Sequence, residues 1–369
     1  MAYSEQEARR LVVEAGRRLL ERGLVARTWG NISARISDTH FVITPSGLGY
    51  ETMTPERLVV VDGRDGSWEG ARKPSSEKGI HADAYRLRPS VDFVIHTHQD
   101  MATICGVAGR DLVTGHALLG GRVSCAAYGL PSTQKLRRAV AEQVAANPHS
   151  GAFLLRNHGA LCLGTDMEKA FAVSEALEEV CRERVARAVP PPELPVYIPD
   201  FGESRRQGDA FVLQLGGAEH VCSLSAPGRE PAAALHAALY RSGAAGAVIH
   251  LRDPDTVAVS MEGRTLRPLV DDLAQIAGAA VRCVSSYEGA EVLRGLGRRA
   301  AVLLQGAGAL CVGADREEAA AVAQLLKKGC LARRFGETMP GCQPLGRGDA
   351  ALQRLIYVTT YARRKDAEE

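Results

Sequence analysis

The sequence predicts an α/β protein made of two tandem domains. Helical and strand-like segments alternate along the 369 residues, a proline-rich stretch interrupts them near the middle, and parts of the first half recur in the second. A chain of this length exceeds one average domain. Alternating helices and strands are typical of a sheet that is covered by helices.

The first half opens with an amphipathic pattern, because apolar side chains recur every three or four residues and Gly23 then ends the pattern. Short strand-like pieces bounded by Gly, Pro, Asp and Ser follow. Two further apolar strands alternate with three helical patterns. The predicted elements are helix 5–24, strands 32–36, 41–44 and 58–61, helix 76–86, strand 92–98, helix 136–146, strand 152–155 and helix 166–188.

A linker is predicted where the last of these helices meets Val-Pro-Pro-Pro at 189–192, since proline cannot continue a helix and keeps the chain extended. We therefore predict a first domain over 1–189, a Pro-rich linker over 190–208 and a second domain over 209–369.

The second domain repeats parts of the first in the same order. Residues 301–313 parallel 152–164, residues 247–253 parallel 93–99, and residues 235–241 parallel 80–86. Three ordered matches indicate an internal duplication. We expect the second copy to be reduced, since no counterpart of the N-terminal helix or of the Gly-Asn-Ile-Ser segment at 30–33 is recognisable.

The second copy lacks the side chains of the first at three polar positions. Arg252 stands where the first copy has His98, Ala307 where it has His158, and Ala232 where it has Glu77. Because apolar scaffold residues persist while these side chains do not, we expect the polar set of the first copy to have a role beyond folding.

Composition narrows the range of functions. The net charge is +2, charged residues make up 24% and aromatic residues 5%. No basic tract with interleaved aromatics and no apolar stretch of membrane-spanning length occurs, so neither nucleic acid nor a membrane is expected as partner. The nine cysteines never form a Cys-x-x-Cys pair. We expect a cytoplasmic protein with reduced cysteines and no thiolate zinc site.

Three histidines form the strongest candidate site. His96 and His98 are two residues apart at the end of a predicted strand, where alternate side chains point to one face. His158 follows a second strand, from which a loop residue can reach the same point. Three neutral imidazoles leave one coordination position open, as a catalytic zinc site requires.

Other polar residues are ambiguous from sequence alone. Glu77 begins a predicted helix, where an acid can serve the helix dipole or act as an acid/base group beside a metal. His81 shares its helix face, and its counterpart His236 is retained in the second copy, which favours a structural role. Small polar loop residues suit a phosphate or a carboxylate, or simply form turns and caps; they are Gly30, Asn31, Ser33, Ser46, Gly47, Ser75 and Ser76.

These residues give the first half a resemblance to the class II aldolase/adducin family, and in particular to its fuculose-1-phosphate aldolase-like members. The motifs that carry the resemblance lie in the family's order over about residues 5–190. They are Thr28-Trp-Gly-Asn-Ile-Ser33, Ile43-Thr-Pro-Ser-Gly47, Pro74-Ser-Ser-Glu77, His96-Thr-His98, Tyr128 and Asn157-His-Gly159. The second half resembles a degenerate copy of the same domain without the metal ligands.

The resemblance implies an α/β/α sandwich around a mainly antiparallel sheet, duplicated in tandem. It implies a divalent metal on His96, His98 and His158, with Zn²⁺ expected and Mn²⁺ or Co²⁺ as alternatives. It also implies Glu77 as the acid/base residue and Tyr128 at the active site. The residues that it implies for a substrate phosphate are Thr28, Gly30, Asn31, Ser46, Gly47, Ser75 and Ser76.

The expected function is a metal-dependent lyase that makes or breaks a carbon–carbon bond in a small, phosphorylated hydroxy-ketone through a metal-stabilised enediolate. Glu77 favours a lyase, since related epimerases carry Asp there. Alternatives are a dehydratase or decarboxylase on the same site, an adducin-like scaffold, and a regulatory ligand site in the second copy. Family aldolases resemble four-fold rings, so we expect a homo-oligomer, with a dimer imitating four domains.

Overall fold

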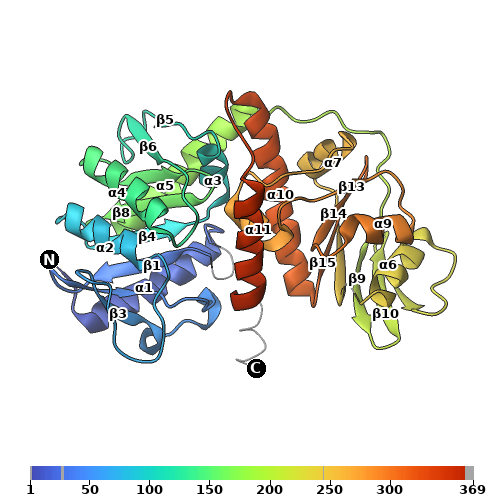
Figure 1. Cartoon of the computed structure of the whole chain (residues 1–369), viewed down its shortest axis with the longest axis horizontal. Helices are drawn as coiled ribbons and strands as arrows, with labels where there is room; N and C mark the ends of the chain where they lie inside the picture. Colours follow the sequence, from blue (N-terminus) through green and yellow to red (C-terminus); the bar gives the residue numbers. More distant parts are fainter. Residues whose placement is uncertain (1, 26–28, 244, 362–369) are drawn as a thin grey trace. The chain divides into compact units, whose positions relative to one another are not determined.

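The computed structural model describes residues 2–25, 29–243 and 245–361. It divides into two compact units, which are described separately (Figure 1). Unit 1 is Met1–Ala188 with Met339–Cys342, and unit 2 is Val189–Thr338 with Gln343–Glu369. No helix among the described residues is long and apolar enough to cross a membrane.

Unit 1 is built on one eight-stranded sheet in the order β3-β2-β1-β4-β8-β7-β6-β5. All neighbouring strands are antiparallel except β6 and β7, which are parallel. The strands are β1 Asn31–Arg35, β2 His40–Ile43, β3 Val59–Asp62, β4 Phe93–Thr97, β5 Leu112–Val113, β6 Arg122–Ala126, β7 Ala152–Leu155 and β8 Gly159–Gly164.

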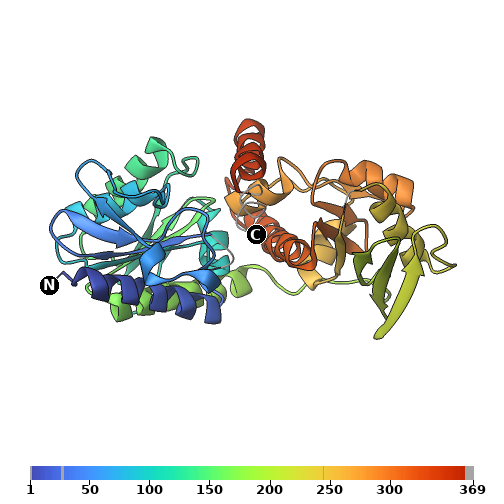
Figure 2. The same ribbon diagram turned by 90° about the horizontal axis from the view of Figure 1, so that it is seen from below.

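Helices cover both faces of this sheet (Figure 2). The α2 and α4 helices pack with one face, in a core that includes Phe41, Tyr85 and Phe153. The α1, α3 and α5 helices lie against the other face. Their bounds are α1 Glu5–Glu21, α2 Lys78–Leu87, α3 Asp100–Gly106, α4 Gln134–Ala146 and α5 Met167–Ala188, with short 3₁₀ turns η1 Tyr50–Thr52 and η2 Pro55–Arg57.

Unit 2 repeats this architecture with seven strands in the order β11-β10-β9-β12-β15-β14-β13. The parallel pair recurs as β13 and β14. Its strands are β9 Glu203–Gln207, β10 Ala210–Leu215, β11 Ala218–Ser223, β12 Ala247–Leu251, β13 Cys283–Val284, β14 Ala301–Leu304 and β15 Gly308–Gly313. Its helices are α6 Pro231–Arg241, α7 Pro254–Met261, α8 Asp271–Ala277, α9 Gly289–Leu296, α10 Arg316–Thr338 and α11 Arg347–Ile356, followed by the π-helical turn η3 Tyr357–Tyr361.

The predicted duplicated α/β fold is confirmed, but one detail of the second copy was wrong. The predicted linker 190–208 contains strand β9, which pairs with both β10 and β12. The polar sequence Glu-Ser-Arg-Arg-Gln hid this strand, because only one of its side chains is buried. By its pairing with β12, β9 is the counterpart of β1, so the second copy keeps a strand where the Gly-Asn-Ile-Ser sequence is missing.

Candidate metal centre

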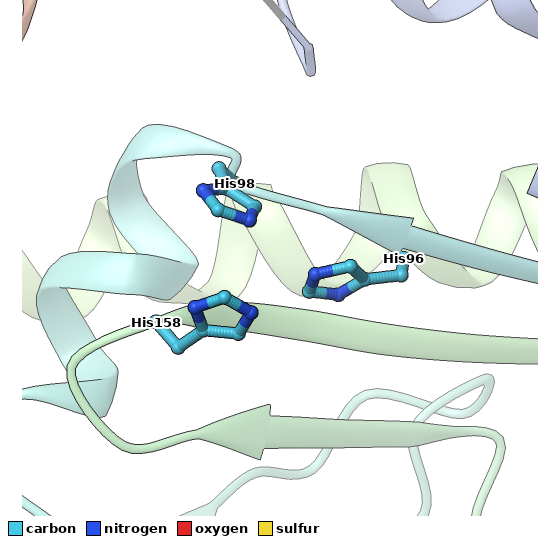
Figure 3. Close-up of side chains that lie close together, drawn as sticks. All are labelled: His96, His98 and His158. Carbon is cyan, nitrogen blue, oxygen red and sulfur yellow. The ribbon is translucent and has the colours of Figure 1, made fainter. Parts of the chain in front are cut away.

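The three predicted histidines converge at the end of the central strand of unit 1 (Figure 3). His96 lies on β4, His98 follows one residue after the strand ends, and His158 lies in the turn between β7 and β8. Each ring offers a nitrogen within 4.8 Å of the nitrogens of the other two, and all three residues are buried. The group can therefore hold one metal ion. No second group of this kind occurs within 2–25, 29–243 and 245–361.

The turn that carries His158 is held in a defined conformation. Asn157 has φ = 62°, a left-handed conformation that asparagine tolerates better than most residues. The His158 amide donates to the Leu155 carbonyl at 3.0 Å. Directly after it, a Cβ on Gly159 would lie 2.2 Å from the Thr97 carbonyl oxygen, so only glycine lets β8 approach β4 this closely.

The segment that carries His98 is fixed from helix α5. The Glu178 carboxylate accepts hydrogen bonds from the Met101 and Ala102 amides, at 2.9 and 3.0 Å, and so caps the first turn of α3. Gln99 donates to the Ser174 carbonyl at 3.1 Å. Both contacts hold the backbone immediately after His98.

His96 is oriented as a metal ligand. Its Nδ1 lies 2.8 Å from the Ala160 carbonyl oxygen, which can only accept, so Nδ1 carries the proton of the neutral ring. The lone pair of Nε2 then faces the cluster, 3.2 Å from Glu77 Oε2. A lone pair and a carboxylate oxygen repel each other unless a proton or a cation lies between them. A backbone carbonyl that fixes the tautomer is the usual support of a ligating histidine.

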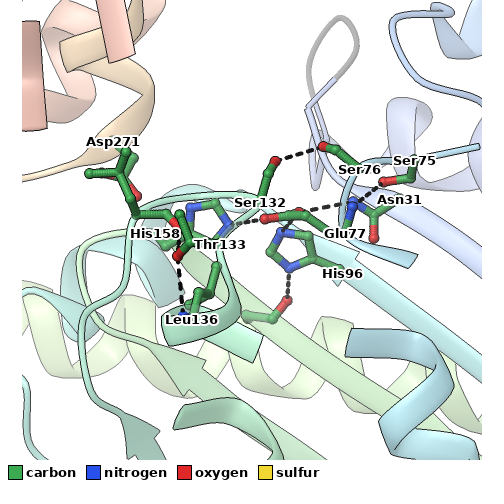
Figure 4. Close-up of polar contacts among 12 residues, drawn as sticks. Asn31, Ser75, Ser76, Glu77, His96, Ser132, Thr133, Leu136, His158 and Asp271 are labelled. Carbon is green, nitrogen blue, oxygen red and sulfur yellow. Dashed lines mark hydrogen bonds and ion pairs between the residues drawn. The ribbon is translucent and has the colours of Figure 1, made fainter. Parts of the chain in front are cut away.

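Glu77 directs its carboxylate at the histidines and not at its own helix. It is the N-cap residue of α2 but makes no side-chain capping bond. Its Oε1 lies 3.1 Å from His158 Nε2, and its Oε2 accepts a hydrogen bond of 3.1 Å from Asn31 Nδ2 (Figure 4). The geometry thus favours the acid/base interpretation of Glu77 over the dipole interpretation.

The electrostatic surroundings keep Glu77 ionised. Burial by itself raises the pKa of this carboxyl, but its electrostatic interactions with the neighbouring His158 and His96 outweigh burial and lower the pKa well below its ordinary value. A bound cation at the same place would act in the same direction.

The loops predicted to bind phosphate are brought together beside Glu77. Ser46 donates its amide to the Lys73 carbonyl, and the Ser75 amide donates to Thr44, each at 3.0 Å. The Ser75 hydroxyl accepts from the Glu77 amide at 3.2 Å, and the Ser76 hydroxyl accepts from Ser132 at 2.7 Å. These contacts place 46–47 next to 75–76.

Three other predicted site residues have different positions. Gly30 packs against the backbone of His96, since a Cβ there would lie 2.6 Å from the His96 carbonyl oxygen. Tyr128 is half-buried on the loop after β6, and its role stays a prediction. Thr28 lies outside the described residues.

The sequence analysis missed what Asn31 does. Its carboxamide bridges Glu77 and His81, whose Nε2 lies 2.5 Å from Asn31 Oδ1. The four-residue spacing of Glu77, His81 and Tyr85 places these three side chains on one helix face, but it does not point to Asn31.

The described residues of unit 2 form no equivalent metal site. His250 corresponds to His96, but Phe201 donates its amide to Nδ1 at 3.0 Å and Nε2 donates to the Ala307 carbonyl at 2.8 Å. Both ring nitrogens are therefore occupied by backbone groups. Arg252, at the position of His98, forms an ion pair of 2.8 Å with Asp200.

Comparisons with known proteins point to one family. The profile of the Class II Aldolase and Adducin N-terminal domain matches residues 10–185 and again 199–333. The 5-methylthioribulose-1-phosphate/5-deoxyribulose-1-phosphate aldolase of Rhodospirillum rubrum is 34% identical over 176 residues, which are 47% of this chain and 77% of the relative. The L-fuculose phosphate aldolase of Escherichia coli K12 is 31% identical over 173 residues, 46% of this chain and 78% of the relative. A solved L-fuculose 1-phosphate aldolase structure is 29% identical, with a TM-score of 0.47 over 53% of this chain and 93% of that one.

Proposed function

The chain belongs to the class II aldolase and adducin family and is a metal-dependent lyase of the aldolase type, and we propose that it cleaves a phosphorylated deoxy-ketose into dihydroxyacetone phosphate and an aldehyde. The observation that carries this proposal is the arrangement of three buried imidazoles around one point, with the Glu77 carboxylate 3.1 Å from one and 3.2 Å from another. A non-catalytic scaffold has no use for such a group.

The resident ion that we propose is Zn²⁺, on His96, His98 and His158. Imidazole ligands suit zinc, and three of them leave a position for substrate. The fixed tautomer of His96, with a lone pair facing a carboxylate oxygen, fits a cation at this point. When bound, the ion polarises the substrate carbonyl and stabilises the negative charge that develops as the carbon–carbon bond breaks.

Glu77 is assigned to the proton that moves at carbon. Cleavage leaves an electron pair on the carbon next to the carbonyl, while the departing carbon becomes an aldehyde and its hydroxyl loses a proton. In the synthetic direction the ionised Glu77 carboxylate removes a proton from the carbon next to the carbonyl, the electron pair left there forms the bond to the aldehyde carbon, and the aldehyde oxygen takes a proton from the Tyr128 phenol. Cleavage reverses these transfers, after Glu77 has taken a proton from solvent and Tyr128 has released one to it. Tyr128→Phe tests the assignment of Tyr128.

The substrate class follows from the polar loops and from the relatives. The paired loops 46–47 and 75–76 bring small hydroxyls together, which suit a phosphate. A cavity of about 400 Å³ adjoins Glu77, with Ser76, Lys78, Ser132 and Arg137 in its wall. The similar enzymes are named for 5-deoxyribulose, 5-methylthioribulose and fuculose phosphates, so we infer a ketose 1-phosphate that lacks its terminal hydroxyl.

The test is product analysis with the full chain loaded with zinc. Incubation with 5-deoxyribulose 1-phosphate, fuculose 1-phosphate and ribulose 1-phosphate is followed by a coupled assay for dihydroxyacetone phosphate. We expect release from a deoxy-ketose, and His98→Ala should abolish both zinc retention and turnover. Glu77→Gln should keep zinc but lower kcat by roughly 10²- to 10⁴-fold.

The matched control is Arg252→Ala, which alters the residue of unit 2 that corresponds to His98 and should leave turnover unchanged. Phosphate-containing product that retains the whole carbon skeleton would instead identify a dehydratase. Loss of carbon dioxide from a sugar-acid phosphate would identify a decarboxylase. No reaction of the zinc-loaded enzyme with any ketose phosphate would refute the proposal.

For unit 2 we propose a part in assembly and not in chemistry, because His250 is bonded to backbone groups and Arg252 is paired with Asp200. We propose a cytoplasmic homo-oligomer, consistent with nine cysteines that are all free, in which two chains supply four aldolase-like domains. Light scattering of the full chain tests this, and a monomeric, fully active protein would contradict it.

A further inference from the structure

A chain of buried hydrogen bonds runs from Glu77 into the interior of unit 1. Glu77 Oε2 lies 3.1 Å from Asn31 Nδ2, and Asn31 Oδ1 lies 2.5 Å from His81 Nε2. Nδ1 of His81 lies 2.6 Å from the Ser33 hydroxyl, which lies 2.7 Å from the hydroxyl of Tyr85. All five side chains are at most 7% exposed.

The direction of each bond in this chain follows from the donors and acceptors. The ionised Glu77 only accepts, so the amide nitrogen of Asn31 faces it and the amide oxygen faces His81. His81 must then donate a hydrogen bond through Nε2 and accept one at Nδ1, where the Ser33 hydroxyl is the donor. Burial lowers the pKa of His81 to about 3, so the ring stays neutral and keeps this single tautomer.

Unit 2 shows which of these hydrogen bonds belong to the shared fold and which occur in unit 1 alone. Ser204, His236 and Tyr240 repeat the Ser–His–Tyr contacts at 2.5 and 2.6 Å. The register of β9 against β12 puts Gly202 at the position of Asn31, and Ala232 stands at the position of Glu77. Within the described part of the chain, the Nε2 atom of His236 has no hydrogen-bond partner. The Ser–His–Tyr set therefore belongs to the fold, and only unit 1 connects it to a carboxylate.

We propose that His81 is a positioning residue for the reaction, which acts through Asn31: it fixes the Asn31 carboxamide so that Nδ2 holds Glu77 Oε2 toward the histidine cluster. The inference rests on the proposed role of Glu77 as the proton carrier. It gives Asn31, which the sequence placed among the phosphate ligands, a further role in the orientation of Glu77.

The physical reason lies in the freedom of a glutamate side chain. Its rotatable bonds allow many positions for the carboxylate, and Glu77 gains no fixation from capping its own helix. A proton carrier works efficiently only when it is held near the productive geometry by neighbours that are themselves fixed. The Asn31 amide alone could flip, whereas a His81 tautomer locked by Ser33 prevents the flip.

Two substitutions at His81 each keep one of its hydrogen bonds. In His81→Gln, the side-chain amide can reach the place of Nε2 and still donate to Asn31. In His81→Asn, the shorter amide can reach the place of Nδ1 and keep Ser33, but not Asn31. The matched control is His236→Asn in unit 2. The readouts are kcat and KM per zinc-loaded site, zinc content and the thermal unfolding midpoint.

We expect His81→Asn to lower kcat by roughly ten- to a hundredfold, the effect of one lost hydrogen bond to a charged group, with KM and zinc content unchanged. His81→Gln should restore most of kcat, and His236→Asn should leave it unchanged. Asn31→Ala should lower kcat as His81→Asn does, and the double variant should be no worse. Additive losses, or equal losses in His81→Gln and His81→Asn, would overturn the proposal.

A measurement without turnover separates this inference from the proposed function. Nitrogen NMR of the metal-free full chain reports the tautomer of His81, which should carry its proton on Nε2 and lose that hydrogen bond in Asn31→Ala. A proton on Nδ1 would overturn the inference even in an active aldolase. If His81→Asn does not fold, Asn31→Asp keeps the size and replaces the donor, and an unchanged kcat there would also overturn it.

Discussion

Gly159→Ala tests whether the metal centre depends on the close approach of β8 to β4. A Cβ at this position would lie 2.2 Å from the Thr97 carbonyl oxygen and 3.3 Å from His96 Cε1, whereas ordinary contact begins at 3.4 Å. The strands must therefore separate by roughly 1 Å. Because His158 precedes Gly159 directly, it would move away from the other two ligands.

Two effects of this displacement are expected. The steric cost of overpacking is about 1–3 kcal/mol in the free energy of unfolding. A displacement of about 1 Å at a catalytic centre can lower turnover by about a hundredfold, and zinc affinity should fall with it. Zinc content by elemental analysis, kcat/KM for the deoxy-ketose phosphate and urea unfolding measure the three quantities.

Gly308→Ala is the matched control, since Gly308 holds the same place in unit 2. Its Cβ would lie 2.2 Å from the Leu251 carbonyl oxygen, and its φ of +92° adds backbone strain. This variant should lose at least as much stability as Gly159→Ala while keeping zinc and turnover. A Gly159→Ala enzyme with normal zinc and activity, or a Gly308→Ala enzyme that loses zinc, would refute the reasoning.

Three further predictions concern the supports of the site. Asn157→Val should lower the free energy of unfolding by about 1–2 kcal/mol, because a β-branched residue is strained at φ = 62°, and Asn157→Gly should cost less, since Gly306 takes this turn in unit 2 at φ = 75°; equal unfolding curves would contradict this. Glu178→Ala should cost roughly 1–3 kcal/mol by leaving two amides of α3 without their acceptor, and should weaken zinc binding in a chelator competition, whereas unchanged affinity would exclude this support for His98. Stability should also fall on acidification, because the pKa values of His81 and His236 are lowered by burial from 6.5 to about 3. The unfolded chain takes up these protons below pH 6.5 while the folded chain does not until about pH 3, so each ring lowers the free energy of unfolding by about 2 kcal/mol at pH 5. His236→Gln should remove one such contribution, which urea unfolding between pH 5 and 7 measures. An unaltered pH dependence of the free energy of unfolding would contradict it.

The sequence predicted those features that repeat or that carry strong periodicity. The three histidines could be grouped because strand ends and a lost counterpart pointed to the same residues, and their convergence is confirmed. Strand β9 could not be predicted from its residues. It pairs on both edges, but only one of its five side chains is buried, so its sequence is mostly polar and lacks the apolar pattern that identifies a strand. The partner of Asn31 was missed for another reason: the sequence gives residue types, but not the rotamer that turns an amide toward a carboxylate 46 residues away.

The comparison of His96 with His250 shows why keeping a histidine is not the same as keeping a ligand. The two residues occupy equivalent positions: His96 on β4 lies opposite Leu161 on β8, and His250 on β12 lies opposite Leu310 on β15. In unit 1 the ring is anchored through Nδ1 to the Ala160 carbonyl, which leaves the Nε2 lone pair for a metal. In unit 2 the anchor is Nε2, bonded to the carbonyl of Ala307, and Nδ1 is taken by a backbone amide. Metal binding is therefore decided by which backbone group each ring meets, and a counterpart histidine restored to position 307 would still face a ring with no lone pair to share.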